Sequence, residues 1–99
     1  MTPGSVDIAV AVDRYLRHVS IERGLSPNTV QAYRRDLAVY TNVLAGRGIH
    51  NPSAITAQDV AAFAHELRSR HERPLSASST ARMLSSVRSW HRFLLDESI

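Results

Sequence analysis

Hydrophobic residues recur at helical spacing in four separate segments of the chain. In each segment apolar side chains return every three or four positions, which places them on one side of an α-helix and leaves polar side chains on the other. The pattern predicts helices over about residues 6–23, 27–45, 57–71 and 77–95. The inward positions are Ile8, Val12, Tyr15 and Val19 in the first helix, Val30, Tyr33, Leu37, Tyr40 and Leu44 in the second, Val60, Phe63, Ala64 and Leu67 in the third, and Thr80, Leu84, Val87, His91 and Leu94 in the fourth, where Met83 and Trp90 flank the stripe.

Start and stop signals agree with these boundaries. Ser26-Pro27 is a strong helix start, because serine accepts a hydrogen bond from an unpaired amide and proline loses none at the first helical position. Thr56-x-x-Asp59 resembles a capping box, with Asp in place of the usual Glu or Gln. Ser5 or Asp7 can cap the first helix. Glycines follow the first two helices, where a left-handed residue commonly ends a helix.

The same pattern defines the fold class as all-α. No segment alternates apolar and polar residues over the length of a strand, and no Asn-Gly or Asp-Gly hairpin signal occurs. Four helices with short connections and one apolar stripe each predict a small orthogonal bundle, an up-and-down bundle being the other arrangement that they allow. A chain of 99 residues is long enough for one domain. We expect a flexible tail over residues 1–5 and a single domain over residues 6–98.

Several classes of protein are excluded by what the sequence lacks. It has no cysteine, so neither a disulfide framework nor a thiolate metal site is expected. Its apolar runs, such as Ile8 to Val12, are far shorter than the roughly 20 residues of a membrane helix. The five histidines show no metal-ligand spacing, and no nucleotide-binding or nucleophile motif is present. We therefore expect a cytoplasmic protein with no membrane contact, no cofactor, no metal and no catalysis by this chain alone.

Charge points to an anionic partner. All twelve basic residues are arginine, the net charge is +3 and the pI is about 10.2. Arginine binds phosphate through two parallel hydrogen bonds, whereas lysine offers a point charge. GC-rich codon usage is the simpler explanation for the missing lysines. Where the arginines lie on the helices is a separate question.

The second and fourth helices carry polar faces typical of nucleic-acid binding. Asn28, Gln31 and Arg35 lie opposite the apolar stripe of the second helix, with Arg34 at the edge, and such side chains can read bases or bind phosphate. No acidic residue occurs between Ser76 and Leu95. The polar face of the fourth helix comprises Ser78, Arg82, Ser85 and Ser89, flanked by Ser86, Arg88 and Arg92. The outer faces of the first and third helices mix charges of both signs, so we expect the second and fourth helices to contact double-stranded DNA.

Several motifs resemble those of a known family. They are Tyr15-Leu16, Glu22 to Ser26, Asn28-Thr29 and Tyr33 to Leu37, followed by Ser78-Ser79, Arg82, Leu84 to Arg88 and Phe93-Leu94. In order and spacing, from about residue 8 to residue 98, they resemble the N-terminal core-binding, SAM-like domain of tyrosine recombinases of the phage-integrase family. The resemblance is greatest to the Xer branch and, within it, to the XerD type. His91 departs from the family pattern, which usually has an aromatic or aliphatic residue there.

The resemblance implies sequence-specific DNA binding by the N-terminal half of a site-specific recombinase that serves DNA integration or recombination, chromosome dimer resolution being one such role. It implies that the second and fourth helices cross the major groove. It also implies that the first helix meets other recombinase protomers in a tetramer on DNA, and that the isolated domain is monomeric. The DNA contacts it carries over are Thr29, Arg34 and Arg35 on the second helix and Ser78, Arg82, Ser85 and Arg88 on the fourth.

The family's catalytic residues, which include a lysine and a nucleophilic tyrosine, have no counterpart here. We therefore expect the catalytic domain, which acts through a phosphotyrosine link, to lie in another part of a longer protein. The alternative hypothesis is a basic helical protein–protein interaction module that meets an acidic partner and has no recombinase role. The salt dependence of DNA binding separates the two hypotheses.

Overall fold

The described part of the chain folds into four α-helices and one 3-10 turn. The computed structural model describes residues 6–69 and 77–99. Within them lie α1 (Ile8–Ile21), α2 (Pro27–Gly46), the turn η1 (Pro52–Ala54), α3 (Ala57–Arg68) and α4 (Ala77–Asp96), and no strand. The predicted all-α bundle is confirmed. The predicted tail over residues 1–5 and the end of the third helix at residue 71 lie outside the described residues, but α3 already ends at Arg68.

Side-chain caps start the helices where the sequence predicts. Asp7 accepts a hydrogen bond from the amide of Ala9 at 3.1 Å, so Asp7 is a cap of α1, while Ser5 lies outside the described part of the chain. The Ser26 hydroxyl accepts from the amide of Thr29 at 3.3 Å. The capping box of α3 is present in both directions, which shows that the shorter Asp side chain fills the role of Glu.

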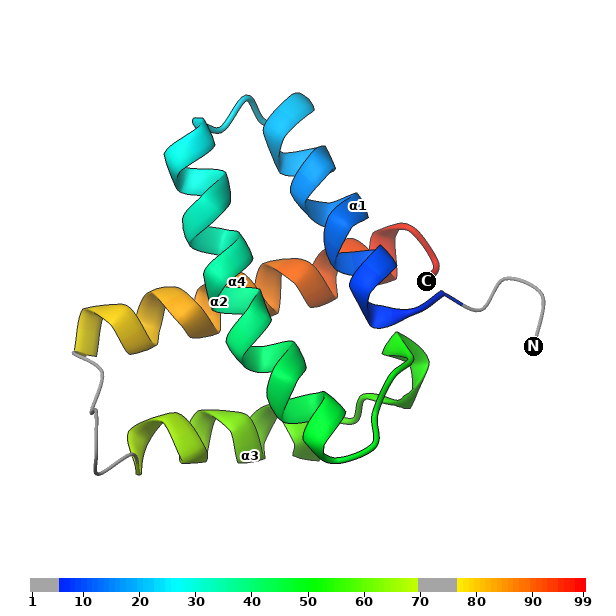
Figure 1. Ribbon diagram of the computed structural model, residues 1–99, viewed down its shortest axis with the longest axis vertical. Coiled ribbons are helices and arrows are strands. Elements are labelled where there is room, and N and C mark those ends of the chain that lie inside the picture. The colour runs from blue at the N-terminus through cyan, green and yellow to red at the C-terminus, as the bar shows by residue number, and fades with distance from the viewer. Residues whose placement is uncertain (1–5, 70–76) are drawn as a thin grey trace.

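The helices form two pairs that cross. In Figure 1, α1 runs beside α2 beyond the short loop that joins them, α4 passes behind α2 at a steep angle, and α3 lies below α4. The predicted orthogonal arrangement is therefore the one observed. No helix among the described residues is both long enough and apolar enough to cross a membrane.

Aromatic side chains fill the centre of the bundle. The Tyr40 ring of α2 meets Phe63 of α3 at 4.8 Å and Trp90 of α4 at 6.0 Å between centroids, edge to face in both pairs. Trp90 is completely buried, so its predicted place at the flank of the inward stripe is wrong. The buried stripe of α4 is wider than predicted and comprises Met83, Leu84, Val87, Trp90, Phe93 and Leu94, because α1, α2 and α3 all pack against this helix.

Candidate nucleic-acid interface

A buried carboxylate joins the two helices that were predicted to bind DNA. Asp36 of α2 is 1% exposed, and its oxygens accept hydrogen bonds from Arg82 Nε at 3.1 Å and Arg82 Nη2 at 2.9 Å. Ser86 Oγ donates to the same carboxylate at 3.2 Å. Arg82 and Ser86 lie one turn apart on α4, so these bonds hold α4 against α2 at their crossing.

This arrangement corrects the predicted polar face of α4. Ser86 was expected beside the exposed arginines, yet it is 2% exposed because its hydroxyl serves Asp36. The segment from Ser76 to Leu95 has no acidic residue of its own, and Asp36 of α2 supplies one to Arg82. The bidentate hydrogen bond, followed by the charge of Asp36, raises the pKa of Arg82, whose side chain is still 52% exposed on its outer side. Arg82 is therefore first a structural residue, and its contact with DNA stays a prediction.

The remaining predicted residues of α2 lie mostly on its outer side. Asn28, Gln31 and Arg35 are exposed. Thr29 is half-buried, and its hydroxyl lies 3.0 Å from that of Ser26, so it belongs to the helix cap. Arg34 reaches Asp13 of α1 at 3.4 Å in a pair that is about half exposed on both sides.

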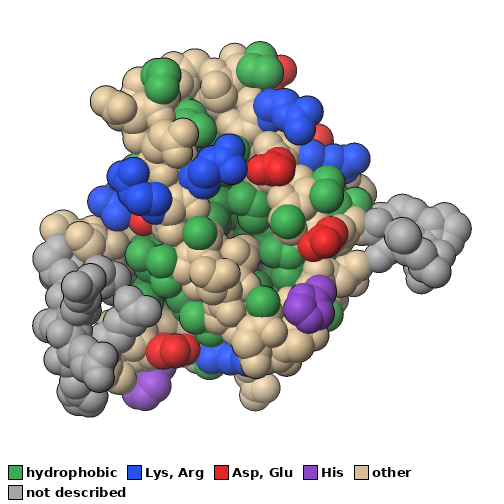
Figure 2. All heavy atoms as spheres, in the orientation of Figure 1, with side chains coloured by type: hydrophobic (Ala, Val, Ile, Leu, Met, Phe, Trp, Pro, Cys, Tyr) green, Lys and Arg blue, Asp and Glu red, His purple; other side chains and the backbone are tan. Residues whose placement is uncertain are grey.

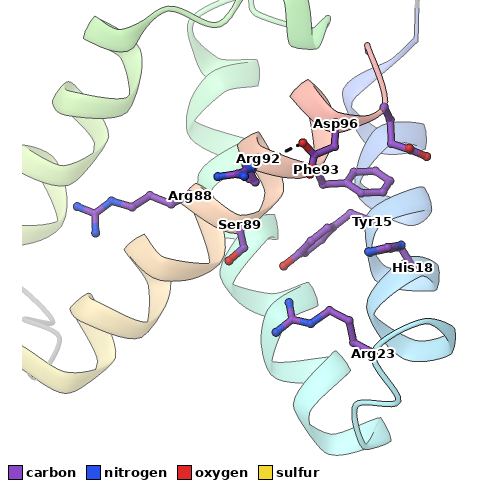
Figure 3. A pocket seen from close by; sticks show the side chains of 9 residues that line it. Tyr15, His18, Arg23, Arg88, Ser89, Arg92, Phe93 and Asp96 are labelled. Atoms are coloured by element: carbon purple, nitrogen blue, oxygen red, sulfur yellow. Dashed lines mark ion pairs between the residues drawn. The ribbon is translucent and has the colours of Figure 1, made fainter.

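The predicted residues of α4 follow the helix from its start to its last turn. Ser78, Ser85 and Arg88 are exposed, and Ser89 is half-buried and lies toward the hydroxyl end of Tyr15 (Figure 3). Arg92 pairs with Asp96 one turn later at 3.6 Å.

Two arginines on these helices have no acidic partner. Arg35 and Arg88 form no ion pair with any residue of the described segments 6–69 and 77–99. Exposed pairs such as those of Arg34 and Arg92 contribute at most about 1 kcal/mol, so a phosphate can compete for these guanidinium groups. On the face shown in Figure 2, basic side chains lie across the upper half with acidic ones between them. On this face the basic side chains are thus more interrupted than the helical projections suggested.

Sequence reasoning missed two residues near this surface. Asp36 lies between Tyr33 and Leu37 on the inward side of α2, and its position beside the apolar stripe was a signal that it is buried. Arg23 follows the end of α1 and lines a pocket with Arg88, Ser89 and Arg92 of α4. No sequence pattern could show that these segments meet.

The fold and this surface define a class of protein. A small all-α domain whose crossed helices expose amides, hydroxyls and unpaired arginines has the chemistry of a nucleic-acid-binding domain. Residues 12–98 match the family described as phage integrase, N-terminal SAM-like domain. The chain therefore belongs to that family.

Curated relatives are recombinases of the Xer type. The chain is 45% identical over 85 residues to the tyrosine recombinase XerD of Bifidobacterium longum, a match that covers 86% of this chain and 27% of the relative. It is 40% identical over 96 residues to XerD of Mycobacterium tuberculosis (93% and 31%) and 36% identical over 83 residues to XerC of Oceanobacillus iheyensis (84% and 26%). The chain thus spans about a quarter to a third of these relatives. No solved structure matches it.

Proposed function

We propose that this domain binds double-stranded DNA as the N-terminal part of a tyrosine recombinase. The observation that carries the proposal is the locked crossing of α2 and α4, because it fixes two polar helix faces relative to one another in a chain of the phage-integrase family. The DNA contacts are Asn28, Thr29, Gln31, Arg34 and Arg35 on α2 and Ser78, Arg82, Ser85, Arg88, Ser89 and Arg92 on α4. Arg35 and Arg88 are the first arginines to test, because neither forms an ion pair within the described segments that would have to break before it could bind a phosphate.

The names of the relatives support a wider role. The whole protein cuts and rejoins DNA through a phosphotyrosine formed by a second domain, in the cytoplasm, and serves recombination or integration, with chromosome dimer resolution as one such process. Its other partners are recombinase protomers assembled on the same DNA. The outer side of α1 is the proposed protomer contact, and it carries two exposed apolar residues, Val10 (48% exposed) and Ile21 (72% exposed).

Salt dependence of binding tests the DNA proposal. We expect the affinity for a fluorescent mixed-sequence duplex to fall linearly on a log–log plot against salt, with a slope of about −0.9 per phosphate neutralised. Arg35→Ala and Arg88→Ala should each reduce the size of that slope by about one. Arg68→Ala, which removes an exposed arginine from α3, is the matched control and should leave the slope unchanged. Fluorescence anisotropy at several salt concentrations measures all four proteins.

A second titrant addresses the alternative hypothesis. Poly-glutamate presents negative charge without the geometry of a phosphate backbone. If the chain binds poly-glutamate as tightly as the duplex, and if Arg35→Ala and Arg88→Ala behave like Arg68→Ala, the DNA assignment of α2 and α4 is wrong and the protein-interaction hypothesis takes its place.

A further inference from the structure

A pocket of about 450 Å³ opens between α1 and the second half of α4. Its walls come from α1, from the segment just after it, and from α4, so it exists only in the folded chain. Figure 3 shows the side chains that line it, with Tyr15, Ser89 and Arg23 grouped at one end. Asp96 and Glu97 lie among the other lining residues.

The Tyr15 hydroxyl has no hydrogen-bond partner among residues 6–69 and 77–99. Tyr15 is 2% exposed, and its oxygen is buried without a donor or acceptor at hydrogen-bond geometry among the described residues. Leaving a buried hydroxyl unpaired costs about 1–3 kcal/mol, so such a group calls for an explanation. Trp90 also has an unpaired nitrogen, but it is enclosed in the core and does not line this pocket.

Two further donors surround this hydroxyl. In Figure 3, Ser89 lies on one side of the phenol oxygen and the Arg23 guanidinium on another, while Arg88 extends away. Burial raises the pKa of Tyr15, and Tyr33 adds to this. The Ser89 hydroxyl approaches the phenol without reaching hydrogen-bond geometry, and its effect and that of the Arg23 charge oppose the rise only in part, so the phenol keeps its proton at neutral pH. The Phe93 ring, 5.5 Å from the Tyr15 ring between centroids, packs against the phenol and limits its rotation.

We infer that Tyr15, Arg23 and Ser89 form a seat for one phosphate of the DNA backbone. All three groups donate hydrogen bonds, and a phosphate has enough oxygens to accept from a phenol, a hydroxyl and a guanidinium together. A bound phosphate would give the Tyr15 hydroxyl the partner that it lacks.

The position on α4 favours a DNA phosphate over a carboxylate from a protein. Ser85 lies one turn before Ser89 on the helix face proposed to meet DNA, so a backbone that follows this face passes the pocket. Asp96 lies at the end of the pocket away from the Tyr15 hydroxyl, so the phosphate is placed at the end that holds Tyr15, Arg23 and Ser89 (Figure 3). This inference rests on the proposed function and adds α1 and the segment after it to the DNA-binding surface.

Tyr15→Phe is the central test because it removes one oxygen and no existing hydrogen bond. We expect it to weaken binding of the mixed-sequence duplex about fivefold to tenfold while the melting temperature stays the same or rises. Arg23→Gln should weaken binding about tenfold and reduce the size of the salt slope by about one. Tyr33→Phe on α2 and Arg14→Gln on α1 are the matched controls, and each should change the affinity less than twofold, to within the scatter of surface substitutions.

The outcomes separate this inference from the proposed function. If the wild-type chain binds the duplex with the expected salt slope but Tyr15→Phe and Arg23→Gln bind like their controls, the phosphate seat is wrong and the DNA proposal stands. If Tyr15→Phe weakens binding to poly-glutamate as much as to DNA, the pocket takes carboxylates and the inference is overturned. A wild-type chain that does not bind the duplex overturns both.

Discussion

Two residues with left-handed backbone end the two long helices in the same way. After α2, Gly48 has φ 78°, and the amides of Gly48 and Ile49 donate to the carbonyls of Ala45 and Leu44 at 3.0 and 2.9 Å. After α4, Ser98 has φ 56°, and the amides of Ser98 and Ile99 donate to Leu95 and Leu94 at 3.2 and 2.9 Å. Both are Schellman motifs, but the second places a serine where glycine is free of strain.

Ser98→Gly should therefore stabilise the chain. The left-handed conformation costs a residue with a Cβ about 1–2 kcal/mol, of which glycine's greater freedom in the unfolded chain cancels a part. We expect a net gain of about 0.5–1 kcal/mol in the free energy of unfolding, measured by urea denaturation.

The glycines of α2 provide a matched pair for this effect. An added Cβ meets no atom within 4 Å at Gly46 or Gly48, so only the backbone conformation differs. Gly48→Ala should cost about 1 kcal/mol because its φ is left-handed, whereas Gly46→Ala should gain about 0.5–1 kcal/mol inside the helix. A loss in both variants would contradict the argument for Ser98.

At the scale of the helices, the Asp36–Arg82 pair links α2 to α4 at the point where they cross. Arg82→Ala would leave a carboxylate buried with only the Ser86 hydroxyl as a partner. Since Arg82 itself is half exposed, we expect a loss of about 2–3 kcal/mol in the free energy of unfolding rather than the larger value for a fully buried pair.

Two further variants show whether the stability lost in Arg82→Ala comes from the unpaired charge of Asp36 or from lost packing. Arg35→Ala, which removes an exposed arginine next to Asp36 in the sequence, should change stability by less than about 0.5 kcal/mol. The double variant Asp36→Asn with Arg82→Ala should recover part of the loss, because the buried charge is gone. Equal stability of Arg82→Ala and the wild-type chain in urea would show that the pair does not hold the crossing.

A second contact between α2 and α4 responds to pH. Tyr40 Oη lies 2.8 Å from His91 Nε2. Burial, helped by the charge of Asp59, raises the pKa of Tyr40, so the phenol keeps its proton and shares a hydrogen bond with the neutral imidazole. Burial lowers the pKa of His91 below its ordinary value of 6.5, because a charged imidazole is poorly solvated there.

The chain should therefore lose stability as the pH falls below about 6.5, where the unfolded state takes up a proton more readily than the folded state. The loss should level off below the lowered pKa of folded His91. His91→Gln keeps an acceptor for Tyr40 but does not titrate, so its urea midpoint should depend less on pH between about pH 7.5 and 5. The exposed His50→Gln is the control, and a pH profile of His91→Gln equal to that of His50→Gln would exclude His91 as the source.

At the scale of the whole molecule, folding redistributes the charge that the sequence shows. The net charge of +3 is spread over arginines that differ in their surroundings. Arg82 is fixed by a buried acid, Arg34 and Arg92 have exposed acidic partners, and Arg35 and Arg88 have none among the described residues. The arginines proposed for DNA binding are therefore of three kinds. Only substitutions of Arg35 and Arg88 test phosphate contact without also breaking an ion pair seen among the described residues.

The fold could be predicted from the sequence because the signals that specify its helices are local. A stripe of apolar residues, a Ser-Pro start or a Thr-x-x-Asp box acts within a few residues, so helix bounds came within two residues for α1, α2 and α4. Whether a single side chain at the edge of a stripe is buried or exposed was predicted less accurately. Ser86 and Trp90 were assigned too far outward, because their burial depends on which helix packs against them.

The sequence by itself determined an all-α domain, its four helices, and the two helices whose outer faces carry amides, serines and arginines. Only the tertiary structure decided that Asp36 neutralises Arg82 across the crossing, that Tyr40 and His91 share a hydrogen bond, and that Arg23 and Ser89 meet around the Tyr15 hydroxyl. The physical reason is range: helix formation depends on neighbours in the sequence, whereas ion pairs and pockets form between segments that only packing of the apolar stripes brings together.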